Sequence, residues 1–298
     1  MRRRLGSDLT DVVGDLISAD DDVLAIRVSS GDLVRVPTPD VVAARLIAPS
    51  PRSAIELEGV TARGWPAPDS EWLGQWWLRA ADGFTSRANS VRPLGSPGVG
   101  LDEALSRVEA WYRERGLPPK MQVVVGSSLD RELEHRGWLT YYEVVDLTAT
   151  VARVSAGLAQ RTASTQNVEL RESTPSSAWL GLLRGGNNPP SARLIVEGSP
   201  MVAFATITDD GEAVAIGRAA VELPWVGLTA IEVAPHARRR GYATAVMGAL
   251  VRWAGERGAL RVYLEVLSTN APALALYEPL GFVEHHRYAC RVMPAERS

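Results

Sequence analysis

A repeated segment constrains this chain most, because it shows that one structural unit is used twice. Trp111 to Gly116 reads WYRERG and Trp253 to Gly258 reads WAGERG, and both close helical patterns. Three further matches keep the same order at offsets of 141 to 144 residues. These matches are Gly98-Val99-Gly100 with Gly241-Tyr242-Ala243, Met121 to Val125 with Val262 to Val266, and Arg136-Gly137-Trp138 with Leu280-Gly281-Phe282. The spacing predicts a duplicated α/β unit in which one copy is degraded.

The segment before the repeat has a different pattern. Residues 11–48 hold short alternating apolar runs, broken by turn residues at Asp20 to Asp22 and Ser29 to Asp32, which predicts a small antiparallel barrel. Pro49-Ser50-Pro51 predicts a linker, because closely spaced prolines resist helix and central strand. We therefore expect three domains: a barrel over 1–52, the degraded unit over 53–162 and the second unit over 163–298.

Composition excludes several classes of protein. The formal net charge of -3 on 298 residues gives no general attraction to nucleic acid or to an acidic membrane. Cys290 is the single cysteine, so an intramolecular disulfide and a cysteine-clustered zinc site are excluded. The chain starts with basic residues but lacks the apolar run of a signal peptide, and it has no apolar run near the roughly 20 residues of a membrane span. We expect a soluble, cytoplasmic protein.

The chemistry-bearing residues gather in the second copy. Three expected strands, 200–207, 213–221 and 228–233, lead into a loop with Arg238, Arg239, Arg240 and Gly241, and an amphipathic helix follows. The first turn of a helix has unpaired N–H groups and the positive end of the dipole, so such a loop suits a phosphate. From these residues alone, a solvated arginine surface with a glycine turn is an equal alternative.

The second copy resembles the GNAT superfamily of N-acetyltransferases. Arg238-x-x-Gly241-x-Ala243 is similar to the Q/R-x-x-G-x-G/A signature of that family. Leu264-Glu265-Val266 with Asn270 and Leu276-Tyr277 is similar to the later half of its core, particularly in ribosomal-protein alanine acetyltransferases. The whole chain also resembles actinobacterial acetyltransferases with an SH3-like N-terminal segment. The resemblance implies tandem mixed-sheet α/β (α+β) units of the GNAT type, the first degenerate, behind a small all-β barrel.

The resemblance also implies a set of roles with acetyl-CoA as co-substrate, and we expect no metal. Tyr277 would protonate the departing thiolate, and Asn270 would contact the cofactor. The backbone of Ile231 and Val233 would hold the pantetheine arm. The pyrophosphate would lie against Arg238, Arg239, Arg240, Gly241, Tyr242, Ala243 and Thr244.

Attack by an amine requires a base. An alkyl amine with a pKa near 10.4 is charged at pH 7, and freeing its lone pair costs about 4 to 5 kcal/mol. Glu265 is the first candidate, because it stands twelve residues before Tyr277, as in the alanine acetyltransferases; facing solvent or pairing with an arginine is the equal alternative. Glu232 is the second candidate for the base. The backbone amide of Val233 is the expected hydrogen-bond donor to the oxyanion of the tetrahedral intermediate.

The first copy departs from the signature. Gly95, Ser96 and Pro97 replace the three arginines, and Asp102 and Glu103 open the helix, where carboxylates repel a pyrophosphate. We infer that this copy no longer binds the cofactor. Trp72, Trp76 and Trp77 are interpreted as core or as an acceptor pocket, with core favoured, and the same choice stays open for Arg87-Ala88-Asn89-Ser90.

The histidines give no metal site at the level of sequence. His285 and His286 are adjacent and should project in opposite directions on a strand, while His135 and His236 have no partners at ligand spacing.

Two functions remain. The first is an N-acetyltransferase that acts on a primary amine of a small molecule or protein by direct attack in a ternary complex, with Tyr277 as acid. The second is a non-catalytic acyl-CoA sensor or interaction protein. Retention of Tyr277 favours the enzyme, and neither the acceptor nor the oligomeric state is fixed by the sequence.

Overall fold

The computed structural model describes residues 1–19, 21–28, 30, 32–45, 50–161 and 167–293. They form two compact units, Met1–Ala48 and Pro49–Ser298. Within the described residues, no helix combines the length and the apolar content that crossing a membrane requires.

The first unit is built of strands. Its sheets have the orders β2-β1-β6 and β3-β4-β5, and Val12, Ile26 and Val36 form its small core. The strands and the one short 3-10 helix are β1 (Arg2–Leu5), β2 (Asp8–Asp11), β3 (Gly14–Ala19), β4 (Val23–Val28), β5 (Leu33–Pro37), η1 (Thr38–Asp40) and β6 (Val41–Ala43). The all-β prediction is confirmed, although in the described residues the strands pair as two sheets rather than as one closed barrel. Of the turn residues behind that prediction, Asp20, Ser29 and Gly31 lie outside the described residues.

Helix α1 (Pro51–Gly64) starts inside the segment that we expected to be a linker. The Ser50 hydroxyl accepts a hydrogen bond from the Ser53 amide at 3.1 Å, and Pro51 occupies the first helical position. The expectation that both prolines resist helix is wrong for Pro51, because an N–H is unpaired at that position in any case. Pro49 lies outside the described residues.

The second unit contains the same series of elements twice, which confirms the repeat. The expected match of Gly98 with Gly241 is wrong by two residues, because Gly100 and Gly241 are the N-cap residues of corresponding helices. The first copy comprises β7 (Asp69–Leu73), β8 (Trp76–Ala80), β9 (Arg92–Pro93), α2 (Leu101–Glu114), β10 (Lys120–Val124), α3 (Ser128–His135) and β11 (Leu139–Thr150). The second comprises β13 (Val202–Asp209), β14 (Glu212–Glu222), β15 (Trp225–Val233), α7 (Tyr242–Glu256), β16 (Arg261–Leu267), α8 (Ala271–Tyr277) and β17 (Val283–Val292). The remaining elements are α4 (Val151–Ala159), β12 (Glu169–Glu172), α5 (Ser177–Leu182), η2 (Leu183–Gly185), α6 (Ser191–Glu197), η3 (Pro235–Ala237) and η4 (Glu278–Leu280).

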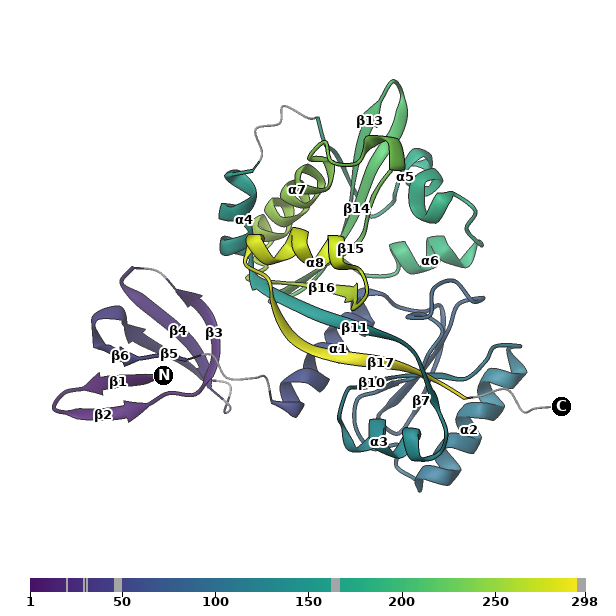
Figure 1. Ribbon diagram of the computed structural model, residues 1–298, viewed down its shortest axis with the longest axis horizontal. Helices are drawn as coiled ribbons and strands as arrows, with labels where there is room; N and C mark the ends of the chain where they lie inside the picture. Colours follow the sequence, from purple (N-terminus) through teal and green to yellow (C-terminus); the bar gives the residue numbers. More distant parts are fainter. Residues whose placement is uncertain (20, 29, 31, 46–49, 162–166, 294–298) are drawn as a thin grey trace. The chain divides into compact units, whose positions relative to one another are not determined.

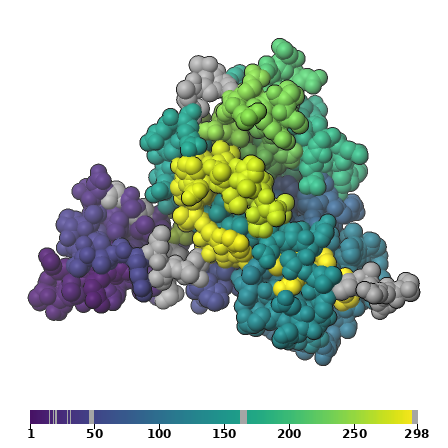
Figure 2. All heavy atoms as spheres, in the orientation of Figure 1, coloured from purple at the N-terminus to yellow at the C-terminus, as the bar shows by residue number. Residues whose placement is uncertain are grey.

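The two copies exchange their last strands. β11 of the first copy pairs with β16 of the second, and β17 of the second pairs with β10 of the first. β11 and β17 also pair with each other, so one sheet runs in the order β10-β17-β11-β16-β15-β14-β13-β12. Figure 1 shows β11 and β17 side by side between the two halves of this unit, and in Figure 2 teal atoms of the first copy cover much of the later part of the yellow segment. Each copy therefore completes the sheet of the other.

Side chains from the first copy also cover one face of the second. Helices α4 and α7 pack on one side of the long sheet, around Val246 and Leu250. On the other side, Trp65 and Phe84 from the first half of this unit join one cluster with Trp179. The second copy thus has a face built partly by its degraded twin.

Candidate functional site

The parallel ladder between β15 and β16 is short. It joins Trp225, Val226 and Gly227 to residues 261–263 and, in the described residues, goes no further. Beyond it, Ala230 has a left-handed φ of 51°, and β15 continues along β14 to Val233. Ile231 and Val233 therefore lie on a stretch whose other edge has parted from β16, where an extended ligand could add backbone hydrogen bonds.

Helix α7 begins at the end of this stretch without a side-chain cap. Its N-cap residue is Gly241, with φ of 80°, and a Cβ added there would meet no atom within 4 Å. The first turn contains Tyr242, Ala243 and Thr244 and no acidic residue. The uncapped N–H groups and the positive end of the helix dipole therefore face an approach that Gly241 leaves open.

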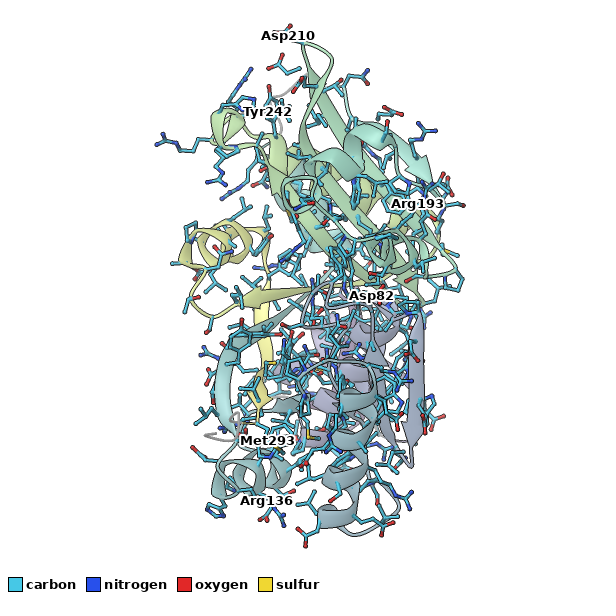
Figure 3. The ribbon with its side chains drawn as sticks, turned by 90° about the vertical axis from the view of Figure 1, so that its right-hand side faces the viewer. Asp82, Arg136, Arg193, Asp210, Tyr242 and Met293 are labelled. Atoms are coloured by element: carbon cyan, nitrogen blue, oxygen red, sulfur yellow. The ribbon has the colours of Figure 1, made fainter. Side chains whose placement is uncertain are left out.

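Three arginines stand before this helix, and all are exposed. Arg238 donates from Nε to the Val233 carbonyl at 3.4 Å, which ties the loop to β15. Arg240 pairs with Asp209 at 3.1 Å and lies 5.0 Å from the centre of the Tyr242 ring, while Arg239 has a φ of 61°. Figure 3 shows Tyr242 and Asp210, from the neighbouring β13–β14 turn, at one end of the unit. The arginine loop and the acidic β13–β14 turn therefore lie at the same end, where Asp209 pairs with Arg240.

The two residues expected on α8 lie at its opposite ends. Asn270 is the N-cap, and its Oδ1 accepts from the Ala273 amide at 3.3 Å. Tyr277 is the last helical residue, is 7% exposed, and packs edge-on against Phe282 with ring centroids 5.7 Å apart. Burial raises the pKa of Tyr277 to about 12, so its phenol keeps its proton at neutral pH.

Glu265 lies on β16 with a side chain that is only 2% exposed. Its Oε2 accepts from Arg87 at 2.5 Å, and its Oε1 lies 3.6 Å from Arg92. Burial by itself would raise the pKa of Glu265, but the charges of Arg87 and Arg92 outweigh it and hold the pKa below its ordinary value. The carboxylate is thus a weakened base, and the pairing with arginine that the sequence left open is present.

Glu232 has a different environment on β15. Its Oε2 accepts a hydrogen bond from the Arg184 amide at 2.9 Å, and the residue is partly buried. Burial raises the pKa of Glu232, and the Arg184 hydrogen bond opposes that rise only in part. Glu232 is therefore the more basic of the two carboxylates.

Sequence reasoning missed the role of the segment 81–92, although it singled out Arg87 and Asn89. The Asn89 side chain accepts from the amides of Ala81 and Gly83 and donates to the carbonyls of Phe84 and Thr85, which fixes this loop. The loop presents Arg87 to Glu265, 178 residues away in the sequence. No local signal could have revealed that contact.

The tryptophans of the first copy behave in two ways. Trp76 is 2% exposed and belongs to the core of its copy, as the packing interpretation expects. Trp72 is 54% exposed and stacks on Trp77 with centroids 5.2 Å apart, so the core interpretation is wrong for Trp72.

A mixed sheet whose parallel strands part beside an uncapped, glycine-started helix is the arrangement of GNAT acetyltransferases. Residues 53–291 match the family model described as "Probable histone acetyltransferase Rv0428c C-terminal", and residues 2–45 match "Rv0428c N-terminal Sm-like domain". The chain belongs to this family of GNAT acetyltransferases, and it is an acyltransferase.

Individual relatives agree with this assignment. The probable histone acetyltransferase Rv0428c of Mycobacterium tuberculosis is 33% identical over 99% of this chain and 93% of its own length. The uncharacterized N-acetyltransferase YobR of Bacillus subtilis is 30% identical over 78% of this chain and 96% of its own. A tandem GNAT protein from the clavulanic acid biosynthesis pathway has a similar fold, with a TM-score of 0.58 at 12% identity over 84% of this chain and 91% of that one.

Proposed function

We propose that this protein transfers an acetyl group from acetyl-CoA to a primary amine of a small molecule or a protein, in a ternary complex. The observation that carries the proposal is the start of α7: a glycine N-cap, no acidic residue in the first turn and three arginines before it, beside the point where β15 and β16 part. A diphosphate is the anion that such a helix start and arginines suit together.

The roles of the other residues follow from placing the pyrophosphate at the start of α7. The pantetheine arm lies along Ile231 and Val233, which brings the thioester toward the edge of β15. The backbone amide of Val233 stabilises the oxyanion. Asn270, on the helix that follows β16, contacts the cofactor through its side-chain amide.

The reaction forms one bond and breaks one. The neutral amine attacks the thioester carbonyl, a C–N bond forms, the C–S bond breaks, and the thiolate takes a proton from the Tyr277 hydroxyl. The amine's proton leaves through a base. We assign that role to Glu232 in preference to Glu265, because burial makes Glu232 more basic while two arginines make Glu265 less so.

The test replaces two first-turn residues of α7 with the acidic residues found at the same positions of α2. Ala243→Asp with Thr244→Glu reproduces Asp102 and Glu103, which favour the helix through its dipole but repel a pyrophosphate. We expect the affinity for CoA, measured by calorimetry, to fall about 100-fold, because two added carboxylates repel the pyrophosphate. Arg252→Glu is the matched control: it changes net charge by the same amount on an exposed position of α7, away from its start, and should leave CoA affinity nearly unchanged.

Equal losses in both variants would show that only net charge matters and would remove the α7 site. Turnover is measured separately, as thiol release from acetyl-CoA against a panel of amines. CoA binding without turnover on any amine would favour an acyl-CoA sensor over the enzyme.

A further inference from the structure

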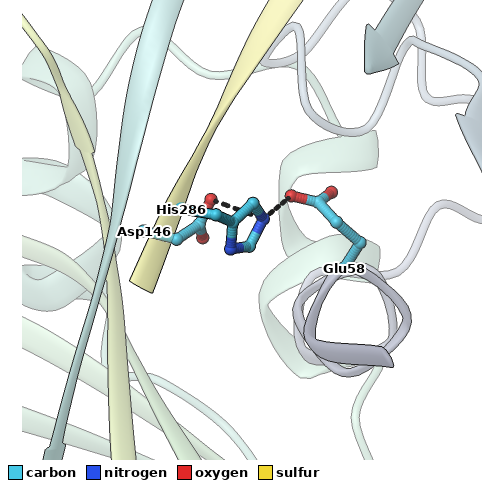
Figure 4. Close-up of side chains that lie close together, drawn as sticks. All are labelled: Glu58, Asp146 and His286. Carbon is cyan, nitrogen blue, oxygen red and sulfur yellow. Dashed lines mark hydrogen bonds and ion pairs between the residues drawn. The ribbon is translucent and has the colours of Figure 1, made fainter. Parts of the chain in front are cut away.

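A second cluster of ionisable side chains lies where the exchanged strands meet helix α1. Glu58 comes from α1, Asp146 from β11 and His286 from β17, and their side chains converge (Figure 4). The side chains are 2%, 0% and 7% exposed, and one ligand atom from each lies within 4.8 Å of the others. Glu58 and His286 are 228 residues apart in the sequence, so no local sequence motif indicates the cluster.

Hydrogen bonding within the cluster is incomplete. His286 Nε2 lies 2.8 Å from Glu58 Oε1 and 3.5 Å from Asp146 Oδ2. Among the described residues, neither oxygen of Asp146 has a hydrogen-bond partner, although that side chain is fully buried. A buried carboxylate without donors is strongly unfavourable, so the charge of Asp146 is compensated either by a proton, since burial raises the pKa of Asp146 to about 7, or by a cation that reaches it.

The neighbouring histidine holds the ring of His286 in place. Asp146 pairs with His286 while Leu147 pairs with Glu284, so His285 is the extra residue of a β-bulge in β17. The expectation that the two histidines project in opposite directions is wrong, because a bulge breaks strand alternation. Their Nδ1 atoms lie 2.9 Å apart, so one of them donates to the other. When His286 Nδ1 is the donor, its Nε2 lone pair faces both carboxylates, as in metal-bound histidines whose second nitrogen is held by another group.

We propose that Glu58, Asp146 and His286 bind a divalent transition-metal ion of the zinc class. One imidazole nitrogen and two carboxylate oxygens suit zinc, whereas magnesium and calcium prefer oxygen alone. Metal–ligand bonds of about 2.0 to 2.2 Å place tetrahedral ligand atoms roughly 3.4 Å apart. The pair His286–Asp146 already has this separation, and His286–Glu58 needs to widen only slightly.

The ion would join the two copies at their exchange. Its ligands come from α1 and β11 in the first half of the unit and from β17 in the second copy. Arg92 pairs with the second oxygen of Glu58 and lies 3.6 Å from Glu265, so its positive charge is next to the three ligands.

The experiment uses full-length protein purified without a histidine tag. Elemental analysis by mass spectrometry after dialysis should find about one zinc-class ion per chain. Asp146→Asn should weaken zinc binding by at least about 100-fold, because it removes a charged ligand. His135→Gln, an exposed histidine on α3, is the matched control and should retain the ion.

A second measurement covers the case in which Asp146→Asn does not fold. Wild-type protein stripped with a chelator should unfold at a lower temperature, and Zn²⁺ but not Mg²⁺ should restore the original midpoint. Wild-type protein that contains no metal and shows no zinc-dependent shift would overturn the proposal and leave a proton shared between Asp146 and His286 as the compensating cation.

Discussion

The two copies differ most at the start of one helix. α7 and α2 both begin after a glycine N-cap without a side-chain cap, Gly241 and Gly100. The first turn of α7 has no acidic residue, while that of α2 has Asp102 and Glu103, and Asp102 pairs with Arg136. Figure 3 shows Arg136 and Tyr242 at opposite ends of the unit. We therefore propose that these few side chains decide which of the two helix starts binds an anion, while the fold of the two copies stays the same.

The copies also differ in how far the central strands run. β15 forms a three-residue ladder with β16 before parting from it, whereas the first copy keeps only an isolated bridge between Val91 and Met121. The first copy nevertheless supplies strand β11 and the side chain of Arg87 to its twin. The first copy therefore has a structural role in the second, whether or not it binds a ligand itself.

The largest effect should come from removing the first copy. Residues 163–298 alone lack β11, whose Val145 and Leu147 belong to the core of the second copy, and they leave β16 without its antiparallel partner. We expect this fragment to show no cooperative unfolding transition in circular dichroism, whereas residues 50–298 should show one. A fragment 163–298 that unfolds cooperatively and binds CoA would mean that the strand exchange is dispensable.

This dependence explains which parts of the fold the sequence could predict. The loop at Arg238 and the helix after it were predictable, because glycine, arginine and helical periodicity act within a few residues. The exchange was not, because either copy's last strand satisfies the same local pattern and only long-range pairing decides between them. Arg87 on Glu265 was missed for the same reason, and so was Pro51 as the first residue of a helix, since proline suits that one helical position.

Among single substitutions, Tyr277→Phe should reduce kcat most. Loss of the acid should lower kcat by about 10² to 10³, with the Kd for CoA nearly unchanged, because only the hydroxyl is removed from a buried ring. Since burial raises the pKa of Tyr277 to about 12, the wild type should show no alkaline loss of kcat from this group below about pH 11. Stopped-flow thiol detection separates chemistry from binding, and a kcat equal to that of the wild type would exclude Tyr277 as the acid.

A smaller effect should distinguish the two carboxylates. A base acts only when deprotonated, so activity falls as the pH drops through the pKa of the base; this fall is the acidic limb of the pH profile. Because burial raises the pKa of Glu232, the acidic limb should lie at a higher pH than it would for an ordinary glutamate. Glu232→Gln should lower kcat/KM by about 10² and abolish that limb.

Glu265→Gln is the comparison. It leaves Arg87 without its buried partner and removes one of the two carboxylates near Arg92, so it should lower the unfolding temperature, while the fall in activity at acidic pH persists. An acidic limb that disappears in Glu265→Gln and survives in Glu232→Gln would reverse the assignment of the base.

The smallest effect should follow from removing the acidic turn of α2. Asp102→Ala with Glu103→Thr takes away two carboxylates that favour the helix dipole, so the free energy of unfolding should fall by about 0.3 to 1 kcal/mol for each. CoA should still bind at one site per chain, because Pro97, Gly98 and Val99, which precede Gly100 as the three arginines precede Gly241, supply no arginine. Calorimetric stoichiometry measures this directly. Two sites per chain would mean that the two carboxylates alone prevent the first copy from binding CoA. It would also mean that the short strand β9 still offers an edge along which the pantetheine arm can lie.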